Sequence, residues 1–110
     1  MSLFTATIAN GASLSGAVPI GAQVITGIVM PAAWTAAVLT FQVSVDDGTT
    51  WSDLYDTTGT EVSFTTAASR FVAVDPSLWL GVSHVKVRSG TAAAAVNQGG
   101  SRAISLVGSQ

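Results

Sequence analysis

The clearest pattern of hydrophobic and polar positions lies in the middle of the chain, from Val38 to Val45. Leu39, Phe41, Val43 and Val45 fall on one face of this segment, and Thr40, Gln42 and Ser44 fall on the other. A period of two is typical of a β-strand with one buried face. We therefore expect a strand here whose odd-numbered side chains enter a core.

Short patterns of the same kind, separated by turn residues, extend along the whole chain. The expected strands are Leu3–Ala9, Ser13–Ile20, Gln23–Met30, Val38–Val45, Trp51–Tyr55, Glu61–Thr65, Arg70–Val74, His84–Arg88 and Ala103–Val107. No stretch has a helical period, and only Ser77–Gly81, which follows Pro76, is expected to form a turn or a single helical turn. About eight short antiparallel strands with regular turns predict one all-β domain over residues 1–110, a β-sandwich with the jelly roll as a candidate topology.

Two of the expected strands carry further information. Pro19 removes a backbone donor, which places Ser13–Ile20 at a sheet edge or ends it. Gln23–Met30 is almost continuously apolar, a pattern typical of a strand buried on both faces. The apolar window from Ala22 to Leu39 is long enough to consider as a membrane span, but Pro31 interrupts it and its first half is β-branched. Two strands joined by a corner at Pro31–Trp34 explain the window better, so we expect no membrane contact.

A turn motif follows the central strand. Ser44, Asp46, Gly48, Thr50 and Trp51 match the pattern S-x-D-x-G-x-T-W, which resembles the Asp-box found in several copies in sialidases and other β-propellers. In that family the box is a hairpin turn remote from the catalytic site. Asp46 can accept backbone hydrogen bonds across such a turn, Gly48 can adopt a positive φ, and Trp51 is expected to anchor the returning strand in the core. A single box in a chain this short excludes a propeller, so these five residues are interpreted as a structural turn.

The composition favours a surface that packs against other protein molecules. Charged residues make up 9% of the 110 residues while hydrophobic residues make up 48%, against about 25% charged residues in ordinary soluble domains. Much of the surface must then consist of Ser, Thr, Gly, Ala or exposed apolar groups. Such a surface favours contacts with copies of the same chain or with a partner.

The few charges are unevenly distributed. Asp46, Asp47, Asp53, Asp56 and Glu61 precede the first basic residue, whereas Arg70, Lys86, Arg88 and Arg102 lie in the second half with Asp75. His84, Lys86 and Arg88 alternate with Val85 and Val87 and are expected to form a modest basic strand edge, which discourages unwanted pairing and is a candidate interface with an acidic neighbour. The net charge of −2 and the lack of a dense basic stripe argue against nucleic-acid binding.

Candidate catalytic, metal and ligand sites are few. The chain has no cysteine, and His84 is its only histidine, without a nucleophile turn that would indicate a triad. The four aspartates from Asp46 to Asp56 lack the spacing of a calcium loop and are interpreted as turn and surface carboxylates. We therefore expect no catalytic residue, metal site or cofactor.

The aromatic residues leave one ligand class open. Trp34, Trp51, Trp79 and Tyr55 are of the kind that stack on sugars in sandwich lectins, although tryptophans in a small β domain are more often core anchors. Trp79, in the segment SLWLG, is expected to be the most exposed of them. It is therefore the best single candidate for an interface or a sugar platform.

Two long segments carry a resemblance to a known group of proteins. MPAAWTAAVLTFQVSVDDGTTWSDLYD and SRFVAVDPSLWLGVSHVKVRSG are similar to small β-rich proteins encoded among the virion structural genes of tailed bacteriophages. The resemblance implies a virion component without enzymatic activity, assembled in the host cytoplasm. The first expectation is a decoration or cement protein that binds copies of itself and the major capsid protein and stabilises the head shell. A component of the tail, the head-tail junction or a fibre is the second, and a carbohydrate-binding β-sandwich is the third.

Overall fold

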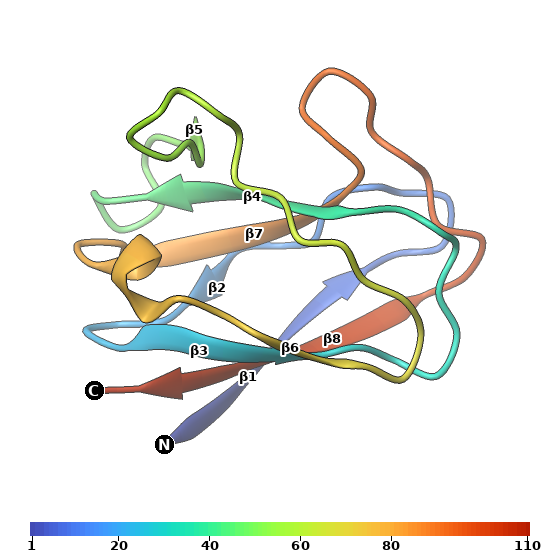
Figure 1. Cartoon of the computed structure of the whole chain (residues 1–110), viewed down its shortest axis with the longest axis horizontal. Helices are drawn as coiled ribbons and strands as arrows, with labels where there is room; N and C mark the ends of the chain where they lie inside the picture. The colour runs from blue at the N-terminus through green and yellow to red at the C-terminus, as the bar shows by residue number, and fades with distance from the viewer.

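Eight strands form two four-stranded antiparallel sheets that pack face to face (Figure 1), in a computed structural model that describes all 110 residues. The first sheet has the order β1 (Ser2–Ile8), β8 (Arg102–Ser109), β3 (Val24–Val29) and β6 (Phe71–Ala73). The second sheet has the order β2 (Val18–Pro19), β7 (His84–Ser89), β4 (Leu39–Ser44) and β5 (Ser52–Asp53). The predicted all-β sandwich is confirmed.

The strand pairs are nested around the middle of the chain. β4 pairs with β5, β3 with β6, β2 with β7, and β1 with β8. The four nested pairs form one long hairpin. When this hairpin is rolled up, the additional pairs β3–β8 and β4–β7 form and complete the two sheets. A double-sheet arrangement of this kind is the jelly roll, the candidate topology indicated by the strand pattern. The turn between β4 and β5 lies at the tip of the hairpin.

The core lies between the two sheets and follows the alternation of the strands. Its buried side chains include Ala6, Ile8, Ile104 and Leu106 from the first sheet and Leu39, Phe41, Val85 and Val87 from the second. Trp79, from the single 3₁₀ helix η1 (Pro76–Trp79), packs edge-on against Phe41 with ring centres 5.1 Å apart. Trp34 also packs against this core and donates through Nε1 to the carbonyl of Ala37.

Several predicted strands are shorter in the structure. Only Val18–Pro19 of the second predicted strand is regular, and it forms a sheet edge, as Pro19 indicated. Glu61–Thr65 contributes isolated bridges rather than a strand. The predicted helical turn after Pro76 is η1, and Asp75 caps it by accepting the backbone N–H of Ser77. Val45 lies beyond the end of β4 and is exposed, so its predicted place in the core is wrong.

The apolar run of β3 has an explanation other than burial on both faces. The register between β3 and β8 shifts between Ile25 and Gly27, which leaves Thr26 as the extra residue of a β-bulge. The bulge allows Ile25 and Ile28 to enter the core although they are three positions apart, whereas Val29 is exposed. No helix of the chain is both long and apolar enough to cross a membrane.

Candidate functional site

The turn after β4 brings together the five motif residues. The carboxylate of Asp46 accepts the backbone N–H and the hydroxyl of Thr50 and the hydroxyl of Ser44. The same Ser44 hydroxyl oxygen accepts the backbone N–H of Gly48 at 2.8 Å, and Gly48 has a φ of 85°, the left-handed conformation predicted for it. These hydrogen bonds fix the conformation of the turn between β4 and β5.

Hydrogen bonds also set the ionisation of the turn. The side-chain hydroxyl of Thr50, then its backbone N–H and the hydroxyl of Ser44, lower the pKa of Asp46 from its ordinary value of 3.8 to about 2. A second turn repeats this arrangement at Asp56, whose pKa is lowered by the hydroxyl of Thr58 and the backbone N–H groups of Thr60 and Thr58. Both carboxylates therefore act as charged hydrogen-bond acceptors that close turns.

Trp51 lies on the opposite side of the second sheet from its predicted position in the core. Its ring is half-buried on the outer face, where Lys86 Nζ stands 4.4 Å from the ring centre, a cation–π contact. Trp51 Nε1 donates to the carbonyl of Gly48. The predicted anchoring in the core is therefore wrong, and Trp51 instead attaches the turn to the outer face of β7.

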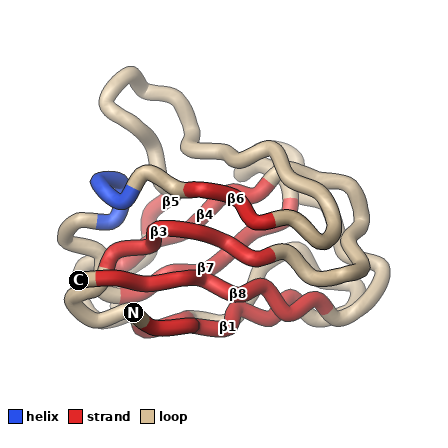
Figure 2. The backbone as a smooth tube through the Cα atoms, turned by 60° about the horizontal axis from the view of Figure 1, so that its bottom comes forward, coloured by secondary structure: helices blue, strands red, loops and turns tan.

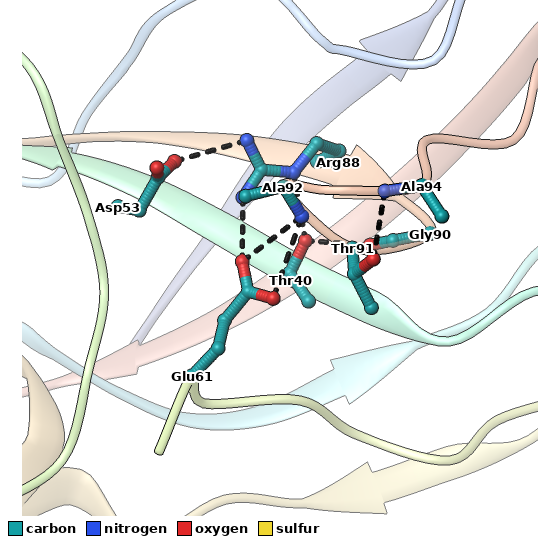
Figure 3. A network of polar contacts seen from close by, with 8 residues as sticks. All are labelled: Thr40, Asp53, Glu61, Arg88, Gly90, Thr91, Ala92 and Ala94. Carbon is teal, nitrogen blue, oxygen red and sulfur yellow. Dashed lines mark hydrogen bonds and ion pairs between the residues drawn. The ribbon is translucent and has the colours of Figure 1, made fainter. Parts of the chain in front are cut away.

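Arg88 is the centre of a buried polar network on the same outer face (Figure 3). Its Nε donates to the hydroxyl of Thr40 at 2.9 Å, and its two terminal nitrogens form ion pairs with Asp53 at 3.0 Å and Glu61 at 2.9 Å. Thr40 in turn donates to the carbonyl of Gly90, and Glu61 accepts the backbone N–H of Ala92. The network ties β4 and β7 to the segment around Glu61 and to the loop that follows β7.

This burial corrects the prediction of a basic edge. β7 lies between β2 and β4, so it is an interior strand with no free edge. Arg88 is only 7% exposed, while His84 and Lys86 are half-buried beneath the turn that contains Gly48 and Trp51. The three residues do form one face of β7, opposite the buried Val85 and Val87, but that face is covered by residues of the same chain.

Trp79 is also in a different place from the one predicted. The prediction that it is the most exposed tryptophan is wrong, because Trp79 is 1% exposed and packs, as the last residue of η1, against Phe41. Its indole Nε1 has no hydrogen-bond partner. Leu80, the next residue, is 73% exposed instead. Trp79 therefore belongs to the core and not to a surface platform.

The side chains best suited to chemistry are engaged in the structure itself. His84 Nδ1 lies 3.1 Å from the hydroxyl of Ser83, but that hydroxyl donates to the carbonyl of Ser44 and accepts the backbone N–H of Asp47. The acidic residues Asp46, Asp53 and Asp56 each have separate protein partners. No group of three or more His, Asp or Glu side chains is placed to hold a metal ion.

The outer face of the first sheet has a surface that the sequence analysis did not identify. Its outward positions are Leu3, Thr5, Thr7, Gly27, Val29, Phe71, Ala73, Ala103, Ser105 and Val107, which we call the uncharged face. Leu3 is 66% and Phe71 62% exposed. Seven of the ten charged residues instead lie in residues 46–61 or on the outer face of β7. The alternation of Leu3, Thr5 and Thr7 in the sequence is the signal that can reveal part of this surface.

A shallow hollow of about 450 Å³ lies on another part of the surface. Leu54, Tyr55, Asp56 and Thr57 line one side of it, and Asp75, Ser77 and Leu78 line the other. Tyr55 is 53% exposed. The intramolecular hydrogen bonds of Asp56 and Asp75 all use Oδ1, which leaves Oδ2 of each carboxylate for other partners.

Comparisons of the chain with protein-family models, with curated proteins and with solved structures find no match.

Proposed function

We propose that the protein is a non-enzymatic structural component of a tailed-bacteriophage virion, and in particular a decoration or cement protein of the head shell. In this role it binds the major capsid protein and neighbouring copies of itself, in particles assembled in the host cytoplasm. The observation that carries the proposal is the uncharged face. The resemblance of two long segments to virion proteins gives the class of particle, and jelly rolls also recur among viral capsid domains.

The uncharged face suits a protein that covers another protein surface. Its ten outward positions contain no charge that would have to be desolvated on docking, and three of its apolar side chains, Leu3, Val29 and Phe71, are at least 40% exposed. A broad sheet face can bury area over its whole extent and gain affinity from apolar contact and shape. Seven of the ten charged residues lie away from this face, in residues 46–61 or on the outer face of β7, which fits attachment by one face.

Binding to head shells tests this proposal. Purified protein is mixed with undecorated shells of the phage that encodes it, and the bound fraction and the melting temperature of the shells are measured. We expect saturable binding in a fixed ratio to the major capsid protein and a higher shell melting temperature. Phe71→Asp places a charge on the uncharged face and should abolish binding without unfolding the protein, whereas Tyr55→Ala, on a different surface, should bind normally.

Other outcomes assign the protein elsewhere. Shells that ignore the protein, or equal binding by the Phe71→Asp variant, would contradict the cement role. Binding to purified tails, but not to shells, would support a tail, head-tail junction or fibre component. The wild-type protein and the same two variants are tested on both shells and tails, so that their binding to the two parts of the particle can be compared directly.

Carbohydrate binding is a second candidate, favoured by the hollow beside Tyr55. An exposed aromatic ring next to carboxylate oxygens that lack partners is a suitable arrangement for stacking on a sugar and accepting its hydroxyl groups. Retention of the protein on immobilised polysaccharides tests it. If retention occurs and Tyr55→Ala removes it while Phe71→Asp does not, the glycan-binding function is supported over the cement function.

A further inference from the structure

The four sheet edges of the molecule differ in how well they are protected. β6 has three residues, and β2 and β5 have two each, with Pro19 in β2. β1 has seven residues and pairs with β8 along its whole length without a bulge. It contains no proline or charged side chain, and no charged residue precedes Asp46. Natural proteins commonly protect edges with short strands, prolines, bulges or lysines. β1 has none of these features.

The backbone of β1 has hydrogen-bonding groups without a partner in the chain. In an antiparallel ladder, the backbone groups of a strand point alternately to its two sides. β8 occupies one side of β1, and no backbone bond outside this ladder involves Ser2–Ile8. Figure 2 shows β1 as the outermost strand of its sheet, and β8 is the only strand that pairs with it. The regular row of donors and acceptors on that edge is complementary to another strand.

The side chains of β1 indicate which strand fits. Phe4, Ala6 and Ile8 face the core side, and Leu3, Thr5 and Thr7 belong to the uncharged face. If a second β1 lies antiparallel about Thr5, each Phe4 stands beside the partner's Ala6 and each Leu3 beside the partner's Thr7. Large side chains then meet small ones on both faces, and no charges are opposed.

We propose that the free edge of β1 pairs antiparallel with β1 of a second copy, centred on Thr5, and joins two first sheets into one eight-stranded sheet. The contact is isologous, since the same residues contribute from both sides of a two-fold axis. The outer edges of the joined sheet are then two copies of the three-residue β6, so the pairing ends at a dimer. The proposal does not depend on the virion role, because it follows from the sheet edge alone.

Cross-linking tests the register directly, because the chain contains no cysteine. In the proposed pair the two Thr5 residues are directly opposite, at a Cα separation of about 4.5–5.5 Å that a disulfide can bridge. Thr5→Cys should therefore form a disulfide-linked dimer under mild oxidation. Leu3→Cys is the matched control, since the two Leu3 positions would be four residues apart along the ladder, roughly 13 Å, and should not cross-link. Efficient linkage of Leu3→Cys, with none of Thr5→Cys, would overturn the register.

Mass measurement over a range of concentrations tests the edge itself. The 11.1 kDa chain should show twice its mass at high concentration in sedimentation equilibrium. Thr5→Lys opposes two like charges at the two-fold axis and should give a monomer with unchanged circular dichroism, because Thr5 is exposed in the single chain. Ala73→Lys puts the same charge on the uncharged face at the far edge and should leave the dimer intact. A wild-type monomer at every concentration, or a dimer lost only in Ala73→Lys, would refute edge pairing by β1.

Discussion

Substitution of Arg88 is the strongest test of how the segment around Glu61 is attached to the outer face of the second sheet. Replacing it with alanine removes three side-chain bonds at once, to Thr40, Asp53 and Glu61. Glu61 is the partner that matters most, because its side chain is only 16% exposed and its carboxylate is left without its cation. Asp53 is 36% exposed and can return to water, so its pair with Arg88 contributes little.

The size of the effect follows from these exposures. A hydrogen bond to a charged group contributes about 1.5–3 kcal/mol, and breaking a buried pair costs about 3–5 kcal/mol when the remaining charge cannot be solvated. With Glu61 partly accessible, we expect Arg88→Ala to lower the free energy of unfolding by about 2–4 kcal/mol. In a domain of this size that corresponds to a fall in melting temperature of about 8–16 °C.

Thermal unfolding followed by circular dichroism measures the loss. Arg70→Ala is the matched control, because Arg70 is exposed and outside both ion pairs, and it should change the melting temperature little. The melting temperature of Arg88→Lys should lie between those of Arg88→Ala and Arg70→Ala, since one ammonium group cannot donate in the three directions of the guanidinium. Adding Glu61→Gln to Arg88→Ala should recover part of the stability by removing the isolated carboxylate. An Arg88→Ala protein that melts within about 2 °C of the wild type would refute this account of the network.

Three further predictions test other parts of the structure. Trp79→Ala should cost about 3–5 kcal/mol because the ring is fully buried, and Trp51→Ala should cost clearly less, as urea unfolding can measure; equal losses would contradict the two placements. Gly90→Ala should lower the melting temperature strongly, since its φ is 88° and a Cβ there would stand 2.6 Å from the carbonyl oxygen of Ala94, whereas Gly16→Ala, with open space around it, should be neutral. The folded pKa of Asp46, about 2, lies below its ordinary value of 3.8, so its charge stabilises the fold above pH 3.8 and this contribution is lost as the pH falls through 2. The difference in melting temperature between the wild type and Asp46→Asn should therefore shrink over that interval, and a constant difference would count against the assignment.

Local patterns predicted the elements that depend on neighbouring residues. The alternation of Leu39 and Phe41 with Thr40 and Gln42 identified β4 and its buried face, and the spacing of Asp46 and Gly48 identified the turn that follows. Both depend on residues within a few positions of one another. The sandwich class followed from the same information, because short strands with frequent turns can bury their apolar faces only against another sheet.

The errors concern contacts between distant parts of the chain. Arg88 is buried because Thr40, Asp53 and Glu61 converge on it from segments 27 to 48 positions away in the sequence. The sequence pattern predicts Trp51 in the core and Trp79 at the surface, whereas Trp79 is buried and Trp51 lies on the outer face of the second sheet. A period of two cannot indicate which way a ring points after the chain has turned. The uncharged face exists only when β1, β8, β3 and β6 are placed side by side, and no local pattern predicts that order.

The nested strand pairs imply an order of events during folding. The pair β4–β5 joins position 43 to position 52, whereas β1–β8 joins position 2 to position 108. Each doubling of the closed loop costs about 0.6 kcal/mol of chain entropy, so pairs nearer the tip of the hairpin are cheaper to form first. We expect the turn at Asp46 to be structured in the folding transition state and β1 to join late, which high φ-values for Thr50→Ala and low ones for Ile104→Val would establish. β1 then becomes a regular strand only in the finished fold. Its free edge therefore pairs with a second copy after the chain has folded, and this pairing does not compete with folding.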